Sequence, residues 1–85
     1  MTTGDDKKWA ESTDEQLLEI ASKWAKKYVL RDLRAFQQSY VNHMATLGNQ
    51  ADSGQKTENE IDIEYRSLQN RWQTATWAID KKTFN

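Results

Sequence analysis

Apolar and small residues recur every three or four positions through the first half of the chain, which is typical of one face of a long helix. Ser12 and Thr13, followed three residues later by Glu15 and Gln16, form capping-box patterns that mark the start of a helix. The pattern therefore predicts a helix over about residues 13–47. Its members are Leu18, Ser22, Ala25, Val29, Leu33, Phe36, Tyr40, Met44 and Leu47.

A second periodic stretch begins after Thr57, which forms a capping box with Glu60. Its apolar positions alternate between steps of four and three, as in a heptad seam. Acidic residues stand at its start and Lys81 and Lys82 near its end, so both ends complement the helix dipole. A helix is predicted over about residues 57–81. The seam consists of Ile61, Tyr65, Leu68, Trp72, Ala75 and Ile79.

The polar, glycine-flanked segment 48–56 is typical of a connection between helices, and two helices joined by a short loop pack antiparallel. The sequence thus predicts an all-α fold, an antiparallel helical hairpin. In this hairpin the seam of the second helix packs on a core stripe of the first. That stripe consists of Val29, Leu33, Phe36, Tyr40, Met44 and Leu47.

The first predicted helix is longer than the second, about 51 Å against about 36 Å. Its first turns carry an apolar face that includes Trp24 and Tyr28 and that needs a cover. Three arrangements would cover this face. A second copy could complete a four-helix homodimer, a break near Leu30–Asp32 could fold the chain back into a three-helix bundle, or a different protein could bind there. We expect a continuous helix, because no glycine or proline interrupts the stripe. Residues 1–11 are expected to form a flexible tail, and residues 12–85 one helical domain.

The amino-acid composition excludes several kinds of catalytic and metal-binding site. The 85 residues include no cysteine and a single histidine, so disulfides, thiolate catalysis and cysteine-based zinc sites are excluded. No metal and no cofactor are predicted. Neither a secretory h-region nor an apolar run of membrane-spanning length is present, which predicts a cytoplasmic protein without a membrane segment.

Four basic residues, Lys23, Lys27, Arg31 and Arg34, share one helix face beside Trp24 and Tyr28; together the four are called the basic ridge. Its interpretation is open between a docking site for an acidic protein or phosphates and a solvated outer face. The overall charge of −1 argues against nucleic acid as the main partner.

On the second helix, Ile63 and Trp77 lie opposite the seam and are linked by the short polar residues Ser67, Asn70 and Thr74. The pattern suits a further helix packing closely there, or a tryptophan lying along the surface. Trp77 is a candidate interaction position, because tryptophan is enriched at interface hot spots, and Ile63 is a candidate because it shares that face.

Catalysis has little support. His43 has only Ser39 at helical spacing as a candidate nucleophile, and no third group orients the pair. No catalytic residue is predicted. We expect a non-enzymatic protein–protein interaction module, an adaptor, inhibitor or regulator of the size that bacteria, phages and mobile elements encode. Its partner would be a second copy or another protein. The alternative is a nucleic-acid-binding regulator that uses the basic ridge. The candidate interaction positions are Trp24, Tyr28, Lys23, Lys27, Arg31, Arg34, Ile63 and Trp77.

Overall fold

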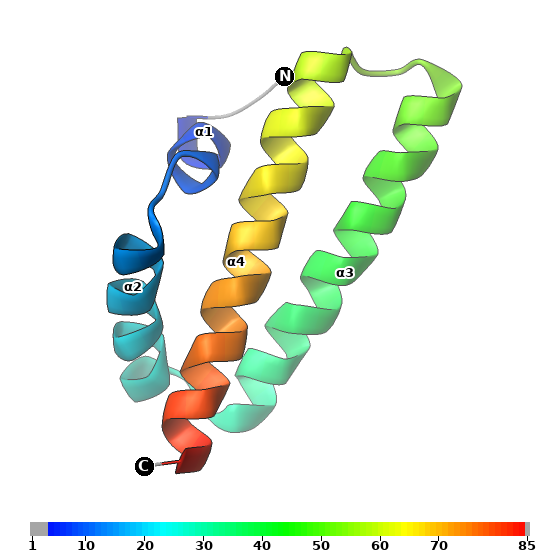
Figure 1. The fold of residues 1–85 in the computed structure, drawn as a ribbon. Helices are drawn as coiled ribbons and strands as arrows, with labels where there is room; N and C mark the ends of the chain where they lie inside the picture. Colours follow the sequence, from blue (N-terminus) through cyan, green and yellow to red (C-terminus); the bar gives the residue numbers. More distant parts are fainter. Residues whose placement is uncertain (1–3, 85) are drawn as a thin grey trace.

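The computed structural model describes residues 4–84, which fold into four α-helices and include no strand (Figure 1). The all-α prediction is confirmed. The helices are α1 (Gly4–Ala10), α2 (Asp14–Lys27), α3 (Leu30–Ser53) and α4 (Glu58–Phe84).

Helix α4 lies at the centre of the arrangement. Helix α3 runs antiparallel along one side of it, while α1 and α2 follow each other along the other side (Figure 1). The Cα atoms extend over 44 × 22 × 15 Å, so the molecule is elongated along its helices.

The expected continuous helix over residues 13–47 is wrong. The chain leaves the helix at Tyr28 and Val29, both with extended backbone (φ −113°, ψ 147° and φ −78°, ψ 162°), and α3 then runs back along α4. This lies just before the break considered at Leu30–Asp32. The physical reason is burial, because folding back packs Trp24 and Tyr28 on Phe36 instead of leaving them in water.

Residues Gly4–Ala10 form α1, where a tail was expected; residues 1–3 lie outside the described part of the chain. Helix α1 is fixed to α4 by polar contacts. The Asn70 side-chain amide donates to the Trp9 carbonyl (2.7 Å), and the Ser67 hydroxyl donates to Asp6 (3.1 Å). A seven-residue helix with few apolar positions has little signal of its own, because helices this short depend on tertiary contacts.

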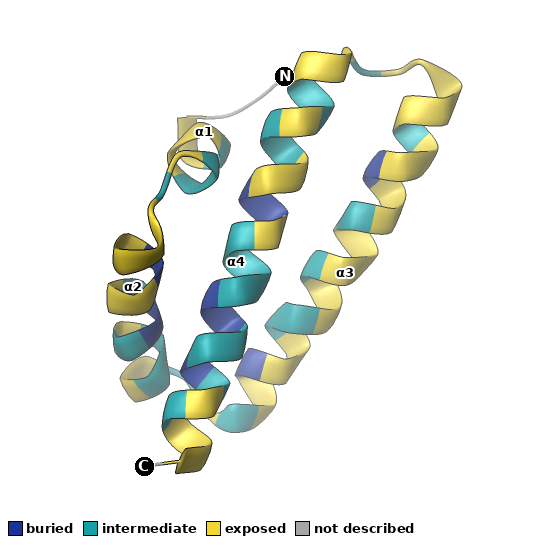
Figure 2. Ribbon diagram, viewed as in Figure 1, coloured by how far each residue is buried: buried dark blue, intermediate teal, exposed yellow. Residues whose placement is uncertain are grey.

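The core follows α4 (Figure 2). Among the predicted seam residues, Leu33, Leu47, Leu68 and Ala75 are buried. The half-buried ones are Phe36, Tyr40, Met44, Ile61, Trp72 and Ile79.

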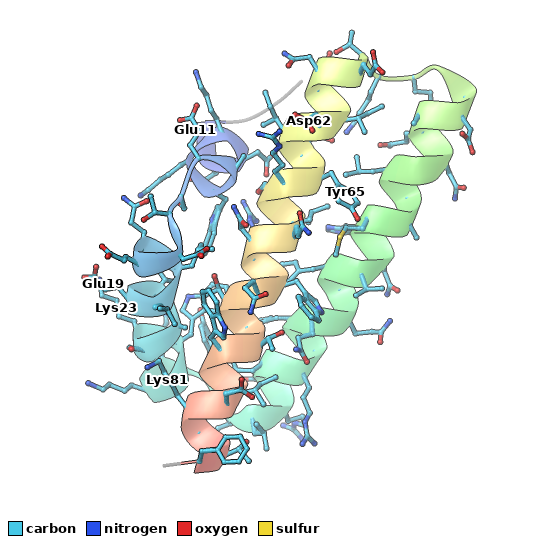
Figure 3. All side chains as sticks on the ribbon, in the orientation of Figure 1. Glu11, Glu19, Lys23, Asp62, Tyr65 and Lys81 are labelled. Carbon is cyan, nitrogen blue, oxygen red and sulfur yellow. The ribbon has the colours of Figure 1, made fainter. Side chains whose placement is uncertain are left out.

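Two seam assignments are wrong: Val29 is 57% exposed and Tyr65 45%. Val29 is the N-cap of α3 and so lies outside the helical register, and Tyr65 points from α4 toward α3 but stays open to solvent (Figure 3). Leu17, Ala21 and Ala78 complete the buried apolar set.

Local capping signals locate the helix starts well. Thr13 and Gln16 form the predicted reciprocal capping box, and the Glu60 amide donates to the Thr57 hydroxyl (3.2 Å). The end of α3 differs from the prediction, because Gly54 rather than Gly48 takes the left-handed conformation (φ 74°) that closes a helix.

Candidate interaction surfaces

Five aromatic rings from α1, α2, α3 and the turn between α2 and α3 form a continuous group, here called the aromatic cluster. Trp24 is its centre, with ring centroids 5.8 Å from Trp9, 6.1 Å from Tyr28 and 5.8 Å from Phe36. Tyr28 and Phe36 meet edge to face at 4.9 Å, and Tyr40 adjoins Phe36. Trp24 and Tyr28 are therefore half-buried, and the chain itself covers the apolar face that the sequence left open.

Arg71 on α4 joins the aromatic cluster to the charges of α1. Its guanidinium donates to Asp6 (3.4 Å) and lies 5.4 Å from the Trp9 ring centroid, while its buried Nε has no hydrogen-bond partner among the described residues. Burial raises the pKa of Tyr40, and the Arg71 charge partly offsets this effect by lowering it.

The basic ridge lies at one end of the molecule, where α2 ends and α3 begins. All four of its side chains belong to exposed residues. Lys23 forms a loose ion pair with Glu19 (4.0 Å), and Lys27 lies 5.3 Å from the Tyr28 ring centroid.

Because α4 ends at the same end of the molecule, further lysines join the ridge (Figures 1 and 3). The Lys82 ammonium donates to the carbonyl of Ala25 on α2 (2.6 Å). Residues 23–34 and 79–84 together hold seven basic residues against two acidic ones, and this surface is called the basic end. Its basic members are Lys23, Lys26, Lys27, Arg31, Arg34, Lys81 and Lys82.

The opposite end of the molecule is acidic. Residues 52–66 hold five acidic residues against two basic ones, and one of each forms the well-shielded Lys56–Glu64 pair (2.5 Å). The overall charge of −1 therefore conceals a separation of charge along the long axis.

A hollow of about 330 Å³ lies between α1, α3 and α4 near this acidic end, with Leu47 and Leu68 among its lining residues. Its charged lining residues belong to the Asp6–Arg71 and Lys56–Glu64 pairs, which balance each other.

His43 also lines the hollow, but no described side chain hydrogen-bonds to it, so no nucleophile and base are paired there. Within residues 4–84, no three His, Cys, Asp or Glu side chains gather as metal ligands would.

Helices α1 and α2 pack on the face of α4 opposite the seam. Ser67 and Thr74 are fully buried there, and Asn70 bonds to α1, so the close helix packing considered for this face is found. Trp77 packs against the buried core group, and Ile63 is half-buried.

The predicted ridge does not form one helix face, because the break at Tyr28 and Val29 puts its two lysines on α2 and its two arginines on α3. The four residues stay at the same end of the molecule, and the spacing pattern did not indicate that Lys26, Lys81 and Lys82 join them. The two α4 lysines carried a signal only as cations near a helix end, and only the fold brings them beside α2.

The chain matches no protein-family model, no curated protein and no solved structure. None of the helices in residues 4–84 combines the length and apolar character needed to cross a bilayer.

Proposed function

We propose that the chain is a non-enzymatic protein–protein interaction module, an adaptor, inhibitor or regulator, that binds an acidic protein through its basic end. The observation that carries the proposal is the convergence of seven basic side chains from three helices on one end of the molecule. A cytoplasmic setting, as the sequence predicts, belongs to the same proposal.

Helix stability accounts for only part of this basic end. Lys26, Lys27, Lys81 and Lys82 lie in the last turns of α2 and α4, where the helix dipole favours cations. The first turns of α3 attract anions instead, so the dipole gives no reason for basic residues there.

Arg31 and Arg34 nevertheless occupy those first turns of α3 and are exposed. Placing them beside the lysines adds like-charge repulsion, which an acidic partner would relieve. This excess of positive charge over what the helices need supports the proposed docking role.

Charge reversal tests the proposal. Lys27→Glu with Arg31→Glu should weaken binding to immobilised polyglutamate at least about tenfold at low salt, because complementary charges dominate such contacts. Binding is measured by interferometry over a series of salt concentrations. Lys7→Glu with Lys8→Glu on exposed α1 positions is the matched control, with the same change in net charge, and should retain most of the affinity. Equal losses in both variants, or no binding by the parent chain, would contradict the proposal.

The second candidate is a nucleic-acid-binding regulator that uses the same surface. One observation favours it: the basic residues spread over three helices rather than along one ridge, which suits contacts to several phosphates. Tyr28 and Trp24 are packed in the aromatic cluster, so stacking on bases has less support.

Duplex and single-stranded DNA distinguish the two candidates. Retention on DNA but not on polyglutamate, with a steep salt dependence that the Lys27→Glu, Arg31→Glu variant loses, would favour the regulator over the protein-binding module. Retention on polyglutamate alone would favour the protein-binding module.

A further inference from the structure

An apolar strip follows the contact between α3 and α4 on one side of the molecule. The side is marked by Gln37, whose amide donates to the Thr76 hydroxyl (2.7 Å). On α3, Val41 and Met44 follow Gln37 at helical spacing, and three apolar residues precede Thr76 at helical spacing on α4. These residues are called the α3–α4 strip. Its members are Val41, Met44, Ile61, Tyr65 and Trp72.

Helices α1 and α2 do not reach this strip, because they meet α4 through its other flank. Ser67, Asn70 and Thr74 mark that flank by their burial and their bonds. Val41 and Tyr65 are each 45% exposed, and Figure 3 shows Tyr65 projecting from α4 toward α3. No helix within residues 4–84 covers the strip.

We propose that a second copy of this chain docks on the α3–α4 strip, antiparallel, about a two-fold axis perpendicular to the helices. Helices α3 and α4 of both copies form a four-helix bundle, with α1 and α2 on its outside. None of the strip residues belongs to the basic end, and the proposal does not rest on the function proposed for that end.

The dimensions of the face fit such a dimer. Helix α4 has 27 residues and α3 has 24. The whole face, about 40 Å long and two helices wide, offers roughly 800 Å² per copy, which is the area per partner of a standard interface. The apolar strip is the part of this face between Val41 and Met44 on α3 and between Ile61 and Trp72 on α4. A two-fold axis also makes the strip its own partner, so one apolar strip is sufficient.

Charge decides the orientation. With the axis perpendicular to the helices, the basic end of each copy lies over the acidic end of the other, whereas a parallel arrangement would superpose two basic ends. Arg34 precedes Val41 by two turns on the same side of α3, and Asp52 follows Val41 by three turns on that side. Because this axis stacks α3 of one copy on α3 of the other in the opposite direction, the antiparallel dimer brings Arg34 of one copy toward Asp52 of the other.

The mass in solution tests the interface. Sedimentation equilibrium from 1 µM to 1 mM should show a shift from 10.0 kDa to twice that mass. Val41→Arg and Tyr65→Arg each should weaken the association more than about tenfold, since each buries a charge in the apolar strip.

The matched control is Leu18→Arg on α2, a position of similar exposure (41%) outside the strip, which should leave the association within about twofold of the parent. Circular dichroism establishes that each variant is folded. A parent chain that stays monomeric up to 1 mM would overturn the proposal. So would a Leu18→Arg variant as impaired as the strip variants.

A charge exchange tests the orientation. Arg34→Glu alone should weaken the dimer about threefold to tenfold, and adding Asp52→Arg should restore it to within about twofold, because the pair is re-formed with reversed signs. A double variant as weak as the two single losses combined would overturn the antiparallel arrangement. Neither experiment uses an anionic ligand, so its outcome is independent of the function proposed for the basic end.

Discussion

Small side chains on α4 determine how closely its neighbours approach. Ser67, Thr74, Ala75 and Ala78 are buried with little or no exposed surface, and the Thr74 hydroxyl is satisfied by donating to the Asn70 carbonyl (2.8 Å). Periodicity predicted that Ala75 is buried, because this residue belongs to the heptad seam. The same reading left the role of Thr74 open, since a short polar residue looks alike on a packed face and in solvent.

The raised pKa of Tyr40 leads to a prediction of how the free energy of unfolding depends on pH. Burial raises its pKa above the ordinary value of 10.0, so the unfolded chain releases this proton first. The stabilisation is complete below about pH 10 and is lost as the pH rises through the folded-state pKa.

The Tyr40→Phe variant isolates this contribution. Urea unfolding between pH 8.5 and 11 should show the parent chain losing more stability than the variant at the upper end of the range. The other ionisable groups are common to both proteins and serve as the internal reference. Parallel stability curves would contradict this assignment.

At the scale of helices, starts were predictable where a side chain caps them. Thr13 and Thr57 satisfy backbone amides of the residues that follow, and such signals lie within four residues of sequence. The break at Tyr28 and Val29 has no such signal, because Val29 caps α3 without a side-chain hydrogen bond. Tertiary packing of the aromatic cluster makes the break, so the sequence periodicity continued through it unchanged.

The uncapped start of α3 leads to a stabilising substitution. Val29 has nearly the same backbone angles as Thr13, which caps α2 with its hydroxyl, and its own side chain is largely exposed. Val29→Ser should therefore raise the free energy of unfolding by about 0.5–1 kcal/mol, because the hydroxyl can accept a bond from an amide of the first turn.

Chemical denaturation measures the effect, and Val29→Ala is the control that removes the same side chain without adding an acceptor. If serine and alanine proved equivalent, Val29 would not act as the N-cap of α3 in solution.

At the scale of the whole molecule, the charge separation follows from the topology. Helical spacing grouped the four ridge residues on one face of a single helix, but the basic end forms instead through the fold-back of α3 and the alignment of α4 with α2. A net charge of −1 gave no indication of it. The α3–α4 strip was not predicted either. Periodicity assigned Tyr65 to the core, and only the positions of the other helices show that it is exposed.

The central place of α4 predicts which fragments fold. A fragment of residues 1–57 lacks α4 and should lose cooperative thermal unfolding by circular dichroism, because the principal contacts of α1, α2 and α3 are with α4. The fragment 12–85 lacks only α1 and should stay cooperative, with a loss of about 2–4 kcal/mol for the Trp9 and Asp6 contacts. Cooperative unfolding of residues 1–57 would show that the aromatic cluster suffices to hold α2 and α3 together.

That same position of α4 has a consequence for synthesis on the ribosome. The helix that organises the others is the last of the four to leave the exit tunnel. Until it emerges, α2 and α3 expose apolar faces that include Leu17, Leu33 and Leu47. Until then the nascent helices depend on chaperones to keep these faces from aggregating, and they fold together once α4 has emerged.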